Sequence, residues 1–428
     1  VLQGVRHLRR RMSAGRHRYG TGGGMSKEFW SGNMAAARAA KLARIQVVAA
    51  YPITPQTHTV EYLSEFIANG ELQAELVKVE SEHSALSVCA GASSVGARAF
   101  TASCSQGLQL MSEVLYFTSG MRFPVVMAIA NRTLSVPVNI WADHQDTLVN
   151  RDCGWIQIYT NSVQEVYDQM LMAFRISEDD EVCLPVLVSY DGFILSHASE
   201  VVNTIGQKEA DAFLPKPGST DRPLLDPEQP LQFGEVLFPN WYPDYEYKKH
   251  NALVNSKEVI NKVYADFEKR FGRRYDLIDA YRCRDAEIIF VGIGSMMSTV
   301  QWVVDQLREH GEKVGALNIR VFRPFPEQEL AKAVKKAKTI AVLDRDIGYG
   351  AAGMVFSDIT RALHNHDKRP KALNFIIGLG GKDIVPATIE KCFAIAKTGY
   401  QGQSVYWPDA SVEDKEKPGA VTVGFGGT

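Results

Sequence analysis

Four apolar runs in the first half of the sequence end in polar residues of the kinds that bind ligands or move protons. These runs, at residues 45–50, 76–79, 97–102 and 124–130, are predicted strands. The groups that follow them are Tyr51-Pro52-Ile53-Thr54-Pro55, Glu80-Ser81-Glu82-His83, Ser103-Cys104-Ser105-Gln106-Gly107 and Asn131-Arg132, with Asp143-His144-Gln145-Asp146 shortly after. Ligands of open parallel sheets bind outside the carboxyl ends of the strands. We therefore expect one site built from these groups, with some members serving only as helix caps and turns.

Thr54 and Arg132 together could bind a small anion. Thr54 precedes Pro55, and proline is favoured at the first position of a helix, so Thr54 is predicted to be a helix N-cap. The free N–H groups at a helix N-terminus also attract anions. Arg132 follows an apolar run, and a buried guanidinium needs a carboxylate from the protein or from a ligand. The pair therefore predicts a site for a small carboxylate.

Glu82 has two interpretations. Acidic residues commonly open helices, where they interact well with the helix dipole, and that role alone would explain Glu82. A carboxyl group at a strand end could instead exchange a proton with a bound ligand. The neighbouring His83 and the later His144 are predicted to be hydrogen-bonded polar residues rather than catalytic groups.

A glycine motif in the second half offers a different function. Gly348, Gly350 and Gly353 follow an apolar run at residues 339–344 with the spacing of a dinucleotide-binding loop. That run is not the first strand of its unit, and three residues separate it from Gly348. We therefore expect a glycine turn that lets a helix approach a sheet, and NAD binding stays open as an alternative.

Alternating strands and helices must position all these groups. From residue 32 to about residue 200, apolar runs, including another at 185–189, alternate with helical patterns, which predicts a parallel sheet in an α/β layer. Helices are predicted at Thr57–Ala68 and at residues 106–118. A second α/β unit is predicted from residue 287 to about 397, with strands at 287–292, 314–319, 339–344 and 372–377. The predicted fold class is α/β with two doubly wound sheet domains.

An extended, proline-rich arm is predicted between the two units. Seven prolines and several aromatic residues lie between residues 214 and 245, and a helix is predicted from about residue 256 to 270. The predicted organisation is a leader or start-site artefact at 1–24, a first domain at 25–202, the arm at 203–256, a second domain at 257–398 and a glycine-rich tail at 399–428. The tail is predicted to need a neighbour to order it.

Composition narrows the class of protein. The 428 residues carry a net charge of −2, and 45% are hydrophobic and 22% charged, so nothing indicates a nucleic acid or a membrane surface as partner. No run of 18 apolar residues occurs, so no bilayer span is predicted. The six cysteines form no CxxC pair, which argues against a zinc ribbon or a ferredoxin-type cluster and favours reduced thiols in the cytoplasm.

The strand-end motifs occur in the order found in one enzyme family. From about residue 30 to 397 the sequence resembles the α chain of pyruvate:ferredoxin oxidoreductase and its relatives. The motifs that carry the resemblance are Tyr51-Pro52-Ile53-Thr54-Pro55, Ser81-Glu82, Ser105-Gln106-Gly107, Arg132, Asp143-His144-Gln145-Asp146, Asp191-Gly192-Phe193, Arg323-Pro324-Phe325-Pro326 and Val342-Leu343-Asp344-Arg345. The resemblance implies a thiamine-pyrimidine-binding domain followed by a transketolase C-terminal-like domain.

In this family thiamine diphosphate lies between two chains or domains, and the phosphate-binding half carries a Gly-Asp-Gly motif. No Gly-Asp-Gly occurs here, so the resemblance implies the pyrimidine half and no metal ligand on this chain. It places Mg²⁺ on a β subunit and 4Fe-4S clusters on partners that include γ and ferredoxin-like δ subunits. It implies that Glu82 is the catalytic acid, which activates the cofactor through a pyrimidine nitrogen. It also implies that Thr54 and Arg132 bind the substrate carboxylate. The implied cofactor contacts are Tyr51, Pro52, Ile53, Glu82, Gln106 and Gly107.

The implied reaction is the oxidative decarboxylation of a 2-oxo acid, with transfer of the acyl group to coenzyme A. The implied substrate is pyruvate or an aromatic 2-oxo acid such as phenylglyoxylate. Electrons would pass through partner clusters to ferredoxin or NAD, and the chain alone is expected to be inactive. Thr54 in place of a basic residue indicates a substrate with one carboxylate. Two alternatives remain open: an NAD-binding dehydrogenase subunit that uses residues 348–353, and a non-catalytic assembly subunit.

Overall fold

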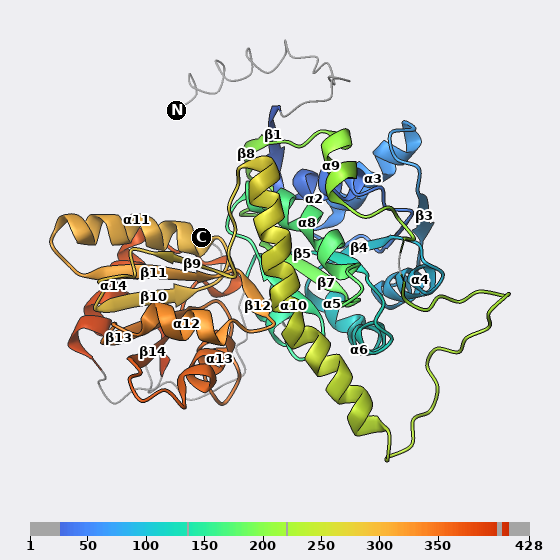
Figure 1. Cartoon of the computed structure of the whole chain (residues 1–428). Helices are drawn as coiled ribbons and strands as arrows, with labels where there is room; N and C mark the ends of the chain where they lie inside the picture. The colour runs from blue at the N-terminus through green and yellow to red at the C-terminus, as the bar shows by residue number, and fades with distance from the viewer. Residues whose placement is uncertain (1–25, 135–136, 220, 400–404, 411–428) are drawn as a thin grey trace, which may run out of the picture.

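The computed structural model describes residues 26–134, 137–219, 221–399 and 405–410. These residues form two α/β units, each with a largely parallel sheet between layers of helices (Figure 1). The predicted fold class, with two doubly wound sheet domains, is confirmed. The predicted leader and residues 411–428 of the predicted tail lie outside the described residues.

The first sheet has seven strands in the order β12-β6-β7-β5-β4-β2-β3, and all neighbours except β12 and β6 are parallel. The strands are β2 (Val47–Ala50), β3 (Glu75–Lys78), β4 (Ala99–Ser103), β5 (Val126–Asn131), β6 (Ile156–Tyr159), β7 (Val186–Asp191) and β12 (Val321–Arg323). The five predicted strands of this unit match to within two residues, whereas β6 and β12 were not predicted. A separate two-stranded ribbon pairs β1 (Lys27–Ser31) with β8 (Ser199–Asn203).

Helices cover both faces of the first sheet because alternate side chains of its strands point to opposite sides. In β5, Val126 and Ala128 face one layer, while Met127 and Ile129 face the other. One layer contains α2 (Gly32–Leu42), α3 (Thr57–Ala68), α8 (Val163–Ser177) and α9 (Gln207–Phe213), and the other contains α4 (Glu82–Ser94), α5 (Ser105–Leu110) and α6 (Ser112–Gly120). The single helix predicted at 106–118 is two helices, because Met111, with ψ of −6°, ends α5 before α6 begins.

The helix α10 (Tyr242–Phe271) joins the two units and begins well before the predicted residue 256. Pro243 lies in its first turn, where proline is tolerated, so the last prolines and aromatics of the predicted arm belong to a helix start. The buried residues Val259, Val263 and Phe267 pack into the core of the first unit. The boundary predicted at residue 257 therefore falls inside a helix of the first core. Among the described residues no helix is both long and apolar enough to cross a membrane.

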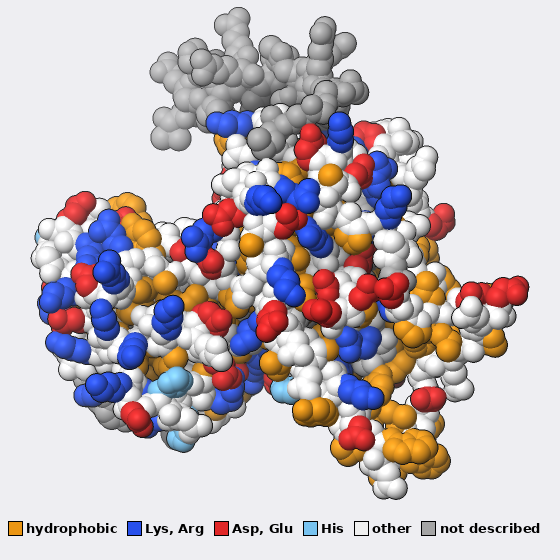
Figure 2. Space-filling model, viewed as in Figure 1, with side chains coloured by type: hydrophobic (Ala, Val, Ile, Leu, Met, Phe, Trp, Pro, Cys, Tyr) orange, Lys and Arg blue, Asp and Glu red, His pale blue; other side chains and the backbone are white. Residues whose placement is uncertain are grey.

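The described residues between 216 and 241 form no helix or strand, and one isolated bridge joins Asp226 to Gln229. Large hydrophobic side chains stay exposed along this arm, with Val236 at 86% and Phe238 at 66%. Figure 2 shows hydrophobic side chains gathered over the arm and the N-terminal end of α10.

The second sheet has six strands in the order β15-β14-β13-β10-β11-β9, of which only β9 is antiparallel to its neighbour. They are β9 (Ile278–Tyr281), β10 (Ile288–Gly292), β11 (Val314–Ile319), β13 (Thr339–Asp344), β14 (Lys371–Ile376) and β15 (Val405–Tyr406). One face packs α11 (Met296–Glu309) and α14 (Pro386–Thr398), the other α12 (Glu327–Val334) and α13 (Met354–Leu363). The prediction that the tail begins at residue 399 is wrong for β15, because Tyr406 stacks on Phe375 at a ring distance of 5.3 Å and pairs with β14.

The strand β12 belongs to the second unit in sequence and to the first sheet in space. Val321 pairs with Ile158 of β6, in antiparallel register. The chain thus returns from β11 to the edge of the first sheet before α12 begins. This crossing fastens the two units through backbone hydrogen bonds.

Candidate active site

The carboxyl ends of β2 and β5 bring Thr54 and Arg132 close to each other. The Nη1 atom of Arg132 donates to the backbone carbonyl of Thr54 at 2.9 Å, and the Sγ atom of Cys104, beyond β4, lies 3.2 Å from the same oxygen. Three strand ends therefore meet at one carbonyl. The contribution of Cys104 was not predicted, since a thiol in an apolar segment gives no sign of a polar contact.

The predicted helix N-cap at Thr54 is wrong. Residues 54–56 form a turn, and α3 begins only at Thr57, after Gln56. The amides of Gln56 and Thr57 both bond to the carbonyl oxygen of Ile53, so the turn, rather than the Thr54 side chain, satisfies the start of the helix. The Thr54 residue is exposed and therefore accessible to a ligand.

Arg132 has hydrogen-bonding capacity that the described residues leave unused. Its Nε atom is buried and has no hydrogen-bond partner. In the described part of the chain, no carboxylate lies within 4.0 Å of its guanidinium nitrogens. Since an arginine head presents a fork that fits a carboxylate, the free side of this guanidinium is suited to an external acid.

Glu82 is the first residue of α4, whose N-cap is Ser81. It is buried, at 6% exposure, and none of the hydrogen bonds of the described residues involves its carboxylate. Gly107 lies directly against it, because a Cβ atom added there would stand 2.5 Å from Oε1 of Glu82 and 2.7 Å from Oγ of Ser103. The Ser103 hydroxyl is also buried without a partner. Only glycine permits this close approach of α5 to the carboxylate.

The other predicted contact residues line the same strand ends. Tyr51, at 40% exposure, and Pro52 and Ile53 continue β2, and Gln106 is the exposed second residue of α5. The residue before it, Ser105, has a left-handed backbone with φ of 51° and contacts Gln106 and the carbonyl of Thr133 through its hydroxyl.

A buried carboxylate joins the two strand ends that carry Ser105 and Arg132. Asp146, in the short helix α7 (Gln145–Leu148), is 0% exposed. Its Oδ2 atom accepts from the backbone amides of Ser105 at 2.9 Å and Arg132 at 3.0 Å. Burial raises the pKa of Asp146, although these bonds and one from Asn131 act in the opposite direction. The sequence placed Asp146 near the site without assigning it a role.

His144 is a hydrogen-bonded residue at the junction of the two units rather than a group facing the strand ends. Its Nε2 atom lies 2.7 Å from Oδ1 of Asp191, which also pairs with Arg345 of the second unit at 3.0 Å. Burial acts to raise the pKa of Asp191, but Arg345 and His144 outweigh it and lower that pKa below its usual range. His83 is half-buried, and its Nε2 atom lies 3.6 Å from Oε2 of Glu113. These contacts agree with the structural interpretation of both histidines.

The glycine motif at residues 348–353 does not form a phosphate-binding loop. The amides of Met354 and Val355, at the start of α13, already donate to Asp346 at 2.6 Å and Asp344 at 2.9 Å. A Cβ atom at Gly353 would stand 2.2 Å from the Asp344 carboxyl carbon, so this glycine serves close packing. The first amides of α13 are therefore already bound by side chains of the protein and are not available to a phosphate group.

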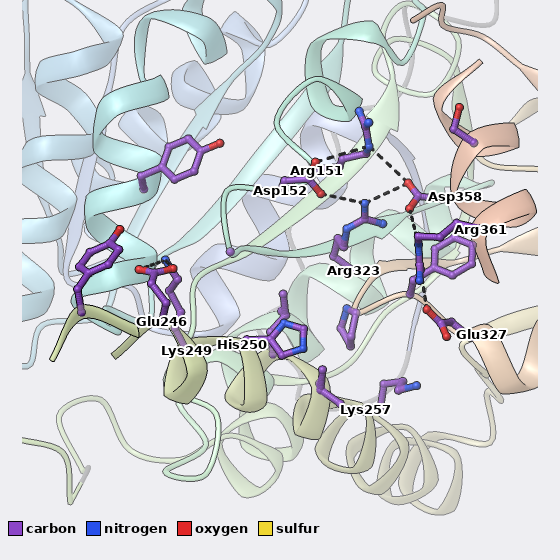
Figure 3. Close-up of a pocket in the computed structure, with 18 residues that line it drawn as sticks. Arg151, Asp152, Glu246, Lys249, His250, Lys257, Arg323, Glu327, Asp358 and Arg361 are labelled. Carbon is purple, nitrogen blue, oxygen red and sulfur yellow. Dashed lines mark hydrogen bonds and ion pairs between the residues drawn. The ribbon is translucent and has the colours of Figure 1, made fainter. Parts of the chain in front are cut away.

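A hollow of about 950 Å³ lies between α10 and the second unit, lined by none of the predicted site residues (Figure 3). Its arginines are held by carboxylates of the protein itself. Arg323 pairs with Asp358 at 3.0 Å and with Asp152 at 3.2 Å, and Arg151 lies 3.4 Å from Asp358. The figure shows these side chains pointing toward one another. This network stabilises the junction of the units.

Comparisons with known proteins agree with the strand-end motifs. The chain matches the family described as "Pyruvate flavodoxin/ferredoxin oxidoreductase, thiamine diP-bdg" over residues 38–265 and "Pyruvate:ferredoxin oxidoreductase core domain II" over residues 286–389. The pyruvate synthase subunit PorA of Methanothermobacter thermautotrophicus is 46% identical, covering 88% of this chain and 96% of its own length. The ketoisovalerate oxidoreductase subunit VorA of Pyrococcus abyssi is 45% identical, covering 89% of this chain and 97% of its own.

A solved structure shares the fold. The 2-oxoglutarate:ferredoxin oxidoreductase from Magnetococcus marinus matches with a TM-score of 0.66 and 18% identity, over 86% of this chain and 65% of that one. The matched regions at residues 38–265 and 286–389, with relatives aligned along nearly their whole length, show that this chain belongs to the pyruvate:ferredoxin oxidoreductase family.

Proposed function

We propose that this chain is the α subunit of a pyruvate-oxidising member of the family, and that it supplies the pyrimidine side of a shared thiamine diphosphate site. The observation that carries the proposal is the carboxylate of Glu82, a residue only 6% exposed, which has no hydrogen bond from the described residues and lies against Gly107. A carboxylate at a strand end that the protein itself leaves without a partner is available to hydrogen-bond to a ligand. The alternative of a non-catalytic assembly subunit leaves this group without a reason.

Glu82 would hold a proton in a hydrogen bond with the aminopyrimidine ring. Thiamine diphosphate, when bound, supplies the thiazolium that stabilises the carbanion left by decarboxylation. Gly107 lets the backbone of α5 approach that ring, and Tyr51, Pro52, Ile53 and Gln106 would line it. The buried Ser103 hydroxyl, which lacks a partner, supports a polar ligand at this place.

Arg132 and Thr54 would bind the substrate carboxylate. The Nη1 atom of Arg132 is already engaged by the Thr54 carbonyl, and the guanidinium has no carboxylate partner within 4.0 Å among the described residues, which leaves its charge available to an acid. Pyruvate is proposed because the PorA relatives, at 46% and 48% identity, are named pyruvate synthase subunits. Ketoisovalerate is the second candidate, because a VorA relative at 45% identity is named for it. The aromatic acid phenylglyoxylate is the least supported of the substrates considered.

Partner chains would supply the remaining chemistry. We infer that a β subunit holds the diphosphate and Mg²⁺, and that γ and ferredoxin-like δ subunits carry 4Fe-4S clusters, because this sequence has neither Gly-Asp-Gly nor CxxC. Ferredoxin is the proposed acceptor, and the residues at 348–353 give no support to NAD. The six buried free cysteines favour a reducing compartment, the cytoplasm.

The test is a substrate panel on the complex assembled with its partner chains. Coenzyme A-dependent turnover should be greatest with pyruvate, lower with ketoisovalerate and lowest with phenylglyoxylate. Equal turnover of all three would contradict the pyruvate assignment, and the same rates with Glu82→Gln would contradict the site.

A further inference from the structure

The environment of Asp146 is built for a carboxylate and for no other side chain. Its Oδ1 atom accepts from Nδ2 of Asn131 at 2.8 Å and from the amide of Thr147 at 2.9 Å. Its Oδ2 atom accepts from the amides of Ser105 and Arg132. Each oxygen therefore faces two N–H donors. An asparagine would direct its own NH₂ group at two of these donors, whichever way its amide were turned.

The neighbouring side chains keep these donors in place. The Asn131 amide turns its NH₂ toward the acceptor-only carboxylate of Asp146, and Oγ of Ser189 donates to the Oδ1 atom on its other side at 2.5 Å. All three residues are buried, at 1% exposure or less. In the described part of the chain no cationic side chain lies within 4.0 Å of Asp146. Since a buried charge without an ion partner is costly, its retention calls for a local purpose.

The two amides bound by Oδ2 belong to the two halves of the site. Ser105 precedes Gln106 and Gly107, and Gly107 lies against Glu82. Arg132 reaches the carbonyl of Thr54. The Oδ2 atom of Asp146 thus holds the Ser105 amide, beside the proposed catalytic acid, at a set distance from the amide of Arg132.

We propose that Asp146 is a positioning residue, whose carboxylate holds the cofactor loop at Ser105 in register with Arg132. The inference rests on the proposed function of Glu82 and Arg132. It predicts that disturbing Asp146 changes cofactor activation and substrate binding together, although the side chain touches neither ligand.

The first experiment compares Asp146→Asn with wild type in the complex assembled with its partner chains. A displacement of about 1 Å can reduce a rate by about 100-fold, so kcat/KM for pyruvate should fall by that order and KM should rise. Exchange of the C2 proton of bound thiamine diphosphate for deuterium should slow in the same variant. Wild-type kcat/KM and wild-type exchange in the assembled variant would overturn the proposal, whatever its Tm.

A matched control separates positioning from stability. Asp168 of α8 is another fully buried carboxylate, which accepts from Nε of Arg273 at 2.6 Å and from the hydroxyl of Tyr275 at 2.6 Å, away from the strand ends. Asp168→Asn should lower Tm and leave KM for pyruvate and C2 exchange within about twofold of wild type. If Asp168→Asn altered both kinetic readouts as much as Asp146→Asn, the effect would be one of stability and the proposal would fail.

A milder variant covers the case in which Asp146→Asn does not assemble. Ser189→Ala removes only the hydroxyl that orients Asn131. A raised KM for pyruvate with slower C2 exchange supports the proposal, and unchanged values of both overturn it. Glu82→Gln and Arg132→Met, measured beside it, distinguish the two levels of inference. If both leave catalysis unchanged, the proposed function fails; if both impair it while the Asp146 series does not, only the positioning role fails.

Discussion

Replacement of Arg132 by methionine tests the substrate half of the site most directly. The change keeps an unbranched side chain and removes the charge and all five donors. The structure shows one donor used internally, toward the Thr54 carbonyl, and one buried donor, Nε, without a partner. In Arg132→Met, a substrate carboxylate would therefore lose the charge and the remaining donors of the guanidinium.

The size of the effect follows from the type of bond. A hydrogen bond to a charged group contributes about 1.5–3 kcal/mol, which corresponds to roughly a 10- to 150-fold loss of kcat/KM for pyruvate. Thr54→Val removes at most a neutral hydrogen bond, about 0.5–1.5 kcal/mol, or roughly a 2- to 10-fold loss. Because Arg132 holds the backbone carbonyl of Thr54, the Thr54→Val variant keeps that contact. The arginine variant should therefore be clearly the weaker enzyme.

The assay is kcat/KM for pyruvate and Kd for thiamine diphosphate in both single variants, the double variant and wild type, all in the assembled complex. If both residues contact one carboxylate, the double variant should deviate from additivity. Arg122→Met is the control, since Arg122 also donates to backbone carbonyls, those of Val182 and Cys183, but far from Thr54 in the chain. Unchanged kcat/KM in Arg132→Met would show that the arginine only tethers the Thr54 turn, and the carboxylate site would then belong to a partner chain.

Four further outcomes are expected. Glu82→Gln should slow C2 deuterium exchange of the bound cofactor by roughly 10²- to 10⁴-fold while the complex still assembles, and a wild-type exchange rate would contradict the acid role. Gly107→Ala should weaken thiamine diphosphate binding, since its Cβ would lie 2.5 Å from the Glu82 carboxylate, whereas Gly91→Ala in α4, with nothing within 4 Å, should leave the affinity unchanged. The purified chain alone should show no turnover with pyruvate, coenzyme A and a dye acceptor, and any turnover would refute the shared site. Burial and the nearby Asp146 raise the pKa of Asp143 to about 7. The protonated Asp143 side chain therefore contributes its full stability below about pH 4, and this contribution is lost as the pH rises through 7. The Tm of Asp143→Asn should accordingly rise relative to that of wild type between pH 5 and pH 8, and a Tm difference that stays constant with pH would argue against the raised pKa.

The sequence was sufficient for the repeating elements of the fold. Buried parallel strands are short continuous apolar runs, so β11 and β13 were predicted to the residue and the other predicted strands matched to within two residues, whereas the buried strand β6 was missed. The strand β12 could not be predicted in the first sheet, because its three residues carry no sign of which edge they will join. The start of α10 was missed because prolines near a helix start resemble those of an extended segment.

For the site, residue types at strand ends predicted which groups would lie together, and the contact of Arg132 with Thr54 agrees. The N-cap assignment of Thr54 failed because a turn at residues 54–56 intervenes before α3. The organisation around Asp146 depends on donors from two distant segments of the chain, at Ser105 and at Asn131-Arg132. No local pattern could have indicated that these donors meet at one carboxylate.

Because β12 belongs to the first sheet, that sheet cannot form fully until most of the second unit's first strands have been synthesised. The edge of β6 stays open until residues 321–323 have left the ribosome, because β12 is its neighbour there. Roughly 160 residues separate the two strands, which a ribosome adds in about 10–30 seconds. Through that interval Ile156 and Ile158 form an apolar strand edge that can pair with another nascent chain. A fragment that stops at the end of α10 would keep this edge permanently, so the first unit should be expressed only with the second attached.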